Sequence, residues 1–387
     1  GLQGVRHLYC GNKLVIWGSP KHWSTTSPVG SHGYARQFAY HGWQVIFISS
    51  PITPLHKFLT ADKAVLAERQ DIHRTAGRWQ EGGKILDYVP WSLLPSKQMP
   101  DYWLTFSFGD IAKVIRHHNL TGSPDVVWID NPEFGCLFTE YPEAKRVLRI
   151  ADRNQDLKGF SQRLLSKQLE LANMVDLVIV TSHSLEKEYK GRGIKRLLRV
   201  PNGVDLKVFQ PALRPEKPAD ITHIRHPIVI FTGMVDYWFD QQLLTEAAGL
   251  MPDVNFVLIG RIGINAAEMA AKPNIHILGE RAAHLVPAYL HHADVGIIPF
   301  KQNEFTDAIN PVKYYEYTAC GLPTVATDTL EFRSMNLPVL LARTAGEFVS
   351  RIKTALALDS QAKSELSRYA RALSWENRWN EVIKHLC

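Results

Sequence analysis

The chain has 387 residues, of which 45% are hydrophobic and 21% charged, and its formal net charge is +6 at pH 7. This composition excludes a disordered chain, and no apolar run approaches the roughly 18 residues that a membrane-spanning helix needs. Its four scattered cysteines have no ligand spacing, which excludes a disulfide framework and a zinc site. Because the first residues also lack the apolar core of a signal peptide, we expect a cytoplasmic protein of two domains.

Positive charge is concentrated in the first half of the chain. Residues 1–200 contain 26 Lys and Arg against 18 Asp and Glu, whereas residues 201–387 contain 18 against 20. A basic half can face nucleic acid, an anionic lipid surface or an anionic substrate, or it can serve solubility alone. Since no zinc-finger or RNA-binding signature is present, we expect no nucleic-acid partner.

Short runs that are apolar on both faces alternate with longer helical patterns through the first 200 residues. Helices are expected near 32–41 and 160–173, and strands are expected at 14–17, 43–49, 125–129, 146–151 and 176–181. Such runs are typical of buried parallel strands joined by right-handed crossover helices. We therefore assign residues 1–200 to an N-terminal, acceptor-binding Rossmann-like domain.

A proline-rich stretch, residues 201–227, is expected to be a linker, and the alternating pattern restarts after it. The expected strands are at 227–233, 255–260, 274–279, 294–300 and 322–327. We assign residues 228–370 to a second Rossmann-like domain, and residues 371–387 to a terminal helix for which packing against the first domain is one option. The expected class is α/β, and ligands of such sheets bind beyond the carboxyl ends of the strands.

The segment 310–327, NPVKYYEYTACGLPTVAT, places a cation and an anion three residues apart on a predicted helix. Asn310 is the predicted N-cap, with Pro311 at the first helical position. A helix N-terminus can bind phosphate, Lys313 adds a full charge beside it, and Glu316 can accept hydrogen bonds from sugar hydroxyls. The alternative is a solvent-exposed ion pair on an ordinary helix.

This segment resembles the donor-binding motif of GT-B glycosyltransferases of group 1, in which a Glu stands five residues before a Gly, here Glu316 and Gly321. The run at 201–205, PNGVD, is similar to the hinge of that group, and residues 176–189 are similar to its preceding strand and helix. The resemblance implies two Rossmann-like domains facing a central cleft, and sugar transfer from a nucleoside diphosphate sugar. Retaining members carry a second Glu where this chain has Ala308, so an inverting reaction is favoured.

A closer resemblance is to the inverting glucuronosyltransferases of xanthan-gum assembly. It implies a catalytic base at Asp152, which follows the run RVLRIA, and a substrate contact at His32, which opens the first helix. Asp156 is the reserve candidate for the base. Each also has a local alternative: a turn residue for the aspartates and a local hydrogen bond for His32.

The same resemblance implies a nucleotide-sugar donor, most often a UDP-sugar, and a lipid-linked or other glycan acceptor. The implied donor contacts are Gly233, Met234, Phe300, Lys313 and Glu316. Strand ends and the expected helix start add Arg261, Glu280 and Asn310 as candidates. Met234 has packing as its alternative and Glu280 a surface turn. No Asp-x-Asp motif is present, so we expect no obligate metal or other cofactor.

Two other functions share this pattern, a nucleotide-sugar epimerase and a non-catalytic nucleotide-sugar-binding protein. A separate feature is the stretch 51–124, where basic and aromatic residues are interspersed. This mixture favours peripheral contact with an anionic membrane surface, on its cytoplasmic face, although the aromatic residues can equally form a core.

Overall fold

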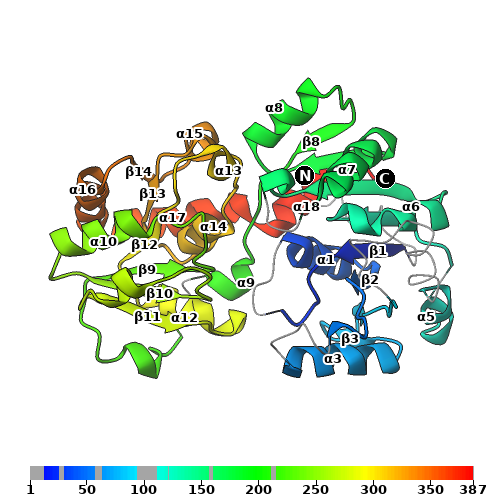
Figure 1. Cartoon of the computed structure of the whole chain (residues 1–387), viewed down its shortest axis with the longest axis horizontal. Coiled ribbons are helices and arrows are strands. Elements are labelled where there is room, and N and C mark those ends of the chain that lie inside the picture. Colours follow the sequence, from blue (N-terminus) through cyan, green and yellow to red (C-terminus); the bar gives the residue numbers. More distant parts are fainter. Residues whose placement is uncertain are drawn as a thin grey trace. The chain divides into compact units, whose positions relative to one another are not determined.

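The computed structural model describes residues 13–25, 30–56, 63–93, 111–120, 122–156, 160–210 and 215–386. The chain divides into two compact units (Figure 1). The first unit contains residues 1–180, 186–200 and 379–387, and the second contains residues 181–185 and 201–378. Among the described residues, no helix combines the length and apolar character that crossing a bilayer requires.

The first unit is built on an eight-stranded sheet in the order β3-β4-β2-β1-β5-β6-β7-β8. All its strand pairs are parallel except the antiparallel pair β3–β4. The strands are β1 (Leu14–Ser19), β2 (Gln44–Ser49), β3 (Arg78–Gln80), β4 (Ile85–Tyr88), β5 (Val126–Ile129), β6 (Lys145–Ile150), β7 (Leu177–Val180) and β8 (Leu197–Arg199). All five strands expected in this half are present, and β3, β4 and β8 were not expected.

Helices connect these strands. They are α1 (Gly30–Tyr40), α3 (Lys63–Arg74), α5 (Ile111–His117), α6 (Cys136–Glu140), α7 (Gln162–Met174) and α8 (His183–Gly191). The terminal helix α18 (Trp375–Ile383) follows the last strand, and its residues from Trp379 onward belong to this unit. The centre of the sheet packs around a stacked tryptophan pair, Trp17 and Trp128, whose ring centroids are 4.4 Å apart. Both indole N–H groups donate to the carboxylate of Asp130, at 3.0 and 3.1 Å, so the pair is buried without an unsatisfied donor.

The second unit contains a six-stranded parallel sheet in the order β11-β10-β9-β12-β13-β14. The strands are β9 (Ile228–Thr232), β10 (Asn255–Ile259), β11 (Ile275–Gly279), β12 (Val295–Ile298), β13 (Thr324–Thr327) and β14 (Leu340–Ala342). The helices are α9 (Leu206–Phe209), α10 (Gln241–Leu250), α11 (Ala267–Ala270), α12 (Val286–His291), α13 (Glu304–Asp307), α14 (Val312–Ala319), α15 (Leu330–Met335), α16 (Ala345–Leu356) and α17 (Ser360–Tyr369).

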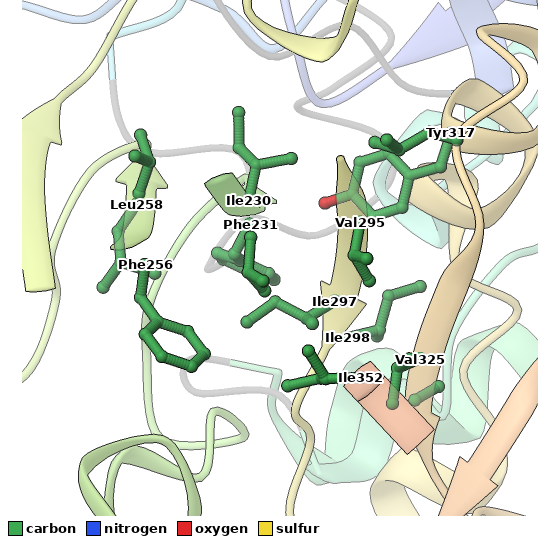
Figure 2. Packing of buried hydrophobic residues seen from close by; sticks show 14 of the residues in the cluster. Ile230, Phe231, Phe256, Leu258, Val295, Ile297, Ile298, Tyr317, Val325 and Ile352 are labelled. Carbon is green, nitrogen blue, oxygen red and sulfur yellow. The ribbon is translucent and has the colours of Figure 1, made fainter. Parts of the chain in front are cut away.

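Side chains from neighbouring strands form the core of the second unit, and Figure 2 shows them with Ile352 of α16 and Tyr317 of α14. Tyr317 is fully buried, and its ring lies against Gly296 of β12, where any Cβ would collide with it. Its hydroxyl accepts a hydrogen bond from the backbone N–H of Thr232 at 2.9 Å. This bond ties α14 to the last residue of β9 and so determines where the other side chains of α14 lie.

Candidate active site

The best-defined part of the candidate site is the turn after β9. Gly233 has a φ of +131°, a backbone conformation that residues with a side chain rarely adopt. A Cβ at this position would lie 2.6 Å from Nζ of Lys313 and still closer to its Cε. Only glycine therefore allows the lysine, which stands one helical turn before Tyr317, to lie directly over the end of β9.

Two aromatic rings flank the Lys313 ammonium group. Its Nζ lies 5.5 Å from the ring centroid of Phe231 in β9 and 6.0 Å from that of Phe300, which follows β12. Both distances are within the range in which a cation is attracted to a ring face. The structure thus brings together Gly233, Phe300 and Lys313, three of the predicted donor contacts, at the carboxyl ends of adjacent strands.

The turn after β10 packs against the turn after β9. The Gly233 N–H donates to the Ile259 carbonyl at 2.7 Å. Gly260 has a φ of +144°, and a Cβ there would collide with the Gly233 carbonyl, so this position also requires glycine. The same contact brings Met234 and Arg261 together, with Nη2 of the exposed Arg261 at 3.7 Å from the methionine sulfur. We call residues 233–234 and 260–261 the glycine-loop pair.

The two predicted acidic contacts differ in environment. Glu316 lies one turn after Lys313 and is half-buried, and burial raises the pKa of its carboxyl to about 7 although the nearby Lys313 charge lowers it. Glu280 follows β11 and is exposed, and its backbone carbonyl accepts a hydrogen bond from Arg281 at 2.9 Å. Glu316 is therefore a carboxyl group that gains or loses its proton near neutral pH.

The raised pKa of Glu316 predicts a pH-dependent stability. The folded state binds the Glu316 proton more tightly than the unfolded state, so its stabilising effect is present below pH 4.5 and is lost as pH rises through 7. Between pH 5 and pH 8, the wild type should lose on the order of 1–3 kcal/mol of unfolding free energy relative to Glu316→Gln. Urea denaturation at both pH values measures this difference, with the exposed Glu268→Gln as control. Parallel pH profiles for wild type and Glu316→Gln would refute it.

The prediction that Asn310 caps α14 is wrong. The helix begins at Val312, Pro311 is its cap residue, and no side-chain hydrogen bond caps it. Asn310 is buried, and its Oδ1 accepts a hydrogen bond from the Tyr315 hydroxyl while its Nδ2 donates to Glu331, both at 2.9 Å. The amide is used inside the protein, which gives Asn310 a structural role and places it away from an accessible donor site.

Glu331, at the start of α15, is a buried acid that the sequence analysis missed. Its Oε2 accepts hydrogen bonds from the backbone N–H of His183 at 2.9 Å and from the His183 ring Nδ1 at 3.1 Å. Three donors, counting Asn310, therefore satisfy this carboxylate. In the sequence, Glu331 looks like an ordinary acid in the first turn of a helix, and no spacing rule marks it as buried.

The predicted base, Asp152, lies in the first unit just beyond the carboxyl end of β6 and is half-buried. The reserve candidate, Asp156, is exposed, and the Arg153 guanidinium lies 3.5 Å from its carboxylate. Asp152 thus combines the strand-end position with partial shielding from water. Among the described residues, no three His, Cys, Asp or Glu side chains gather closely enough to hold a metal ion.

A buried chain of amides supports the turn that carries Asp152. Asn154 donates to Oε1 of Gln168 in α7 at 2.6 Å, and Gln168 Nε2 donates to the hydroxyl of Tyr189 in α8 at 2.5 Å. Gln168 and Tyr189 are almost completely buried. The Gln168–Tyr189 hydrogen bond is buried and the Asn154–Gln168 hydrogen bond is partly buried, so together they restrict the chain two residues after Asp152.

His32 does not have the accessibility that a substrate contact requires. Its side chain is completely buried, with ring centroids 5.1 Å from both Trp23 and Phe47. Its Nε2 is hydrogen-bonded to the His22 carbonyl at 3.1 Å, and burial lowers the pKa of the ring to about 3. Burial and this hydrogen bond favour the local alternative, a neutral packing residue at the start of α1, over the predicted substrate contact.

Two family models match most of the chain between them. Residues 18–181 match the N-terminal domain of glucuronosyltransferase GumK, and residues 226–357 match the glycosyl transferases of group 1. A similar protein is TuaH of Bacillus subtilis (strain 168), whose name assigns it provisionally to teichuronic acid biosynthesis as a glycosyltransferase. It is 25% identical over 315 residues, which are 72% of this chain and 79% of TuaH.

Solved structures share the architecture at low sequence identity. Sucrose-phosphate synthase from Thermosynechococcus elongatus has a TM-score of 0.67 at 14% identity, over 96% of this chain and 98% of that one. Anabaena Alr3699/HepE, solved in complex with UDP and glucose, has a TM-score of 0.63 at 16% identity, over 97% and 99% of the two chains. The predicted α/β class, with two parallel Rossmann-like sheets in a GT-B fold, is confirmed.

Proposed function

We propose that the chain is a group 1 glycosyltransferase of the GT-B fold, with an N-terminal domain of the GumK type, and that it uses a UDP-sugar as donor. The observation that carries this proposal is the ammonium group of Lys313, held over Gly233 at the carboxyl end of β9. Arg261 stands on the neighbouring turn, and the N-terminus of α14 adds backbone N–H groups. This concentration of positive charge suits a diphosphate.

In the proposed reaction, the sugar passes to a hydroxyl of a glycan or lipid-linked acceptor with inversion, in a step of polysaccharide biosynthesis. The acceptor oxygen forms a bond to C1 of the sugar while the bond from C1 to the phosphate oxygen breaks. An alcohol is too weak an acid to lose its proton beforehand, so Asp152 accepts the proton as the new bond forms. The leaving diphosphate keeps the electron pair of the broken bond, and Lys313 and Arg261 stabilise its charge.

Glu316 would contact the sugar rather than the diphosphate. A carboxyl group with a pKa of about 7 can accept a hydrogen bond from a sugar hydroxyl when ionised and can donate one when protonated. We further propose that the two cationic side chains replace a metal ion, so that turnover is unchanged by EDTA. Inhibition by EDTA that added Mg²⁺ reverses would contradict this part of the proposal.

Calorimetric titration tests the donor assignment directly. UDP should bind to the purified chain more tightly than UMP, because only UDP offers a second phosphate to Lys313, and GDP serves as the base control. Release of UDP from UDP-sugars should then depend on an added acceptor. Conversion of the UDP-sugar without an acceptor would favour the epimerase alternative, and the absence of binding by any nucleotide or nucleotide sugar would refute the proposal.

A lipid-linked acceptor would bring the chain to the cytoplasmic face of an anionic membrane. The candidate contacts are Trp79 and Tyr40, which are 39% and 37% exposed, and Lys84, whose Nζ lies 5.8 Å from the Tyr40 ring. Sedimentation with phosphatidylglycerol vesicles should show binding that weakens with salt and with Trp79→Ala. Part of the basic and aromatic stretch 51–124 lies outside the described residues. Equal sedimentation with neutral vesicles would argue against this contact.

A further inference from the structure

A pocket lies in the first unit, away from Asp152. It has a volume of about 350 Å³, within the size range of small-molecule sites. It sits where β2 and β4 end, and its lining comes from the segments that follow these two strands and from the end of α3. The residues that define its chemistry are Ile52, Thr53, Gln70, His73, Arg74 and Trp91.

The backbone around this pocket is firmly held. Ile52 and Trp91 form a parallel β-bridge beyond the ends of the two strands, with Ile52 N–H donating to Pro90 and Ser92 N–H donating to Ile52, both at 2.9 Å. Beneath the bridge, Ile52 joins a small buried cluster of apolar side chains that also contains Leu66, Ile72 and Val89. The described backbone on this side of the pocket is therefore held by interactions within the protein.

The side chains at the pocket suit a sugar ring. Trp91 is 46% exposed, and an indole face attracts the positively polarised C–H groups of a pyranose. His73 Nδ1 is 2.9 Å from the Val89 carbonyl, which requires the proton on Nδ1 and leaves Nε2 as a hydrogen-bond acceptor. The Gln70 side chain can donate and accept hydrogen bonds, and Arg74 can donate them. The hydroxyl groups of a sugar stacked on Trp91 could therefore form hydrogen bonds with these side chains.

The order of the sheet separates this pocket from the proposed base. Along the carboxyl edge, β2 lies three strands from β6, and β4 lies four strands from it. At about 4.8 Å per strand, the pocket is about 14–19 Å from the end of β6 that carries Asp152. A monosaccharide whose hydroxyl reacts at Asp152 does not extend that far, whereas a longer glycan does.

We propose that the pocket is a distal acceptor subsite, in which a pyranose remote from the reacting sugar stacks on Trp91. This inference rests on the proposed glycosyltransferase function. It predicts selectivity for oligosaccharides over monosaccharides, because only a chain can occupy both positions. Both a neutral pyranose and a uronate have a ring that can stack on Trp91. The Arg74 guanidinium would favour the uronate because of its carboxylate.

Fluorine NMR of the full chain labelled with 5-fluorotryptophan tests this subsite. The resonance that is missing from the spectrum of Trp91→Phe is assigned to Trp91. The resonance that is missing from the spectrum of Trp79→Phe is assigned to Trp79, an exposed tryptophan outside this pocket that serves as the control. Cellotetraose and tetragalacturonate are the neutral and uronate probes, with glucose as the short control. We expect one or both tetrasaccharides to shift the Trp91 resonance saturably, glucose to do so much more weakly, and Trp79 to stay unchanged. Gln70→Ala should raise the apparent Kd about tenfold.

Two results would overturn the subsite. The first is that neither tetrasaccharide shifts the Trp91 resonance. The second is that only phosphatidylglycerol vesicles shift the Trp91 resonance, which would assign Trp91 to a membrane contact. UDP titration of the same labelled protein separates this failure from that of the proposed function. If UDP still binds, only the subsite is wrong, and if UDP does not bind, the donor assignment fails first. The melting temperature of each variant verifies that it is folded.

Discussion

Replacing Lys313 by methionine is expected to weaken UDP binding about a hundredfold, which corresponds to about 3 kcal/mol. Methionine keeps an unbranched apolar side chain over Gly233 but ends one atom short of the ammonium group, so it removes the charge together with the cation–π contacts to Phe231 and Phe300. The diphosphate would lose a cation in a partly desolvated position, where one charged hydrogen bond contributes most. Calorimetric titration with UDP measures the effect.

The matched control is Lys353→Met, which removes an exposed lysine from α16 in the same unit. It should leave the Kd for UDP unchanged, so a general effect of net charge is separated from a contact. A Lys313→Met variant that binds UDP as tightly as wild type, with an unchanged melting temperature, would remove the observation on which the proposed function depends.

Replacing Asp152 by asparagine is expected to lower kcat about a thousandfold and to leave the Kd for UDP unchanged. General base catalysis contributes typically about 10²–10⁴ to a rate, and asparagine keeps the shape of the side chain without the ability to accept a proton. The two readouts together separate a catalytic defect from a folding defect, because a misfolded chain would lose UDP binding as well.

Asp156→Asn is the comparison variant for the base. Asp156 is exposed and lies beside Arg153. We expect its replacement to change kcat less than threefold, because a surface ion pair contributes only a small free energy. If Asp156→Asn were the inactive variant and Asp152→Asn retained activity, the base would be reassigned. Full activity of both variants would instead exclude both aspartates as the base.

The sheets were predictable because strands buried on both faces produce short apolar runs, which here alternate with longer helical patterns. The runs 14–17 and 255–260 are examples, and they correspond to β1 and β10. The three-residue strands β3 and β8, with the sequences RWQ and LLR, carry no such run. Their pairing depends on the neighbour that is already in the sheet, which a local pattern does not contain.

The candidate site was predictable where a backbone constraint is visible in the sequence. A glycine that follows an apolar strand signals a special turn, and Gly233 adopts one under Lys313. Burial, by contrast, arises from tertiary packing, so the sequence did not show that His32 is enclosed or that Asn310 hydrogen-bonds to Glu331. A polar residue at a helix start looks the same in a chain whether it faces water or the core.

The contact between Gly296 and Tyr317 makes the position of the Lys313 side chain depend on a glycine. Because the Tyr317 hydroxyl binds the Thr232 amide and its ring occupies the space above Gly296, the placement of Lys313 depends on that empty space. The two positions are therefore coupled through packing. Alanine at position 296 would require a smaller residue than tyrosine at position 317, and the position of Lys313 would then change through a substitution deep inside the protein.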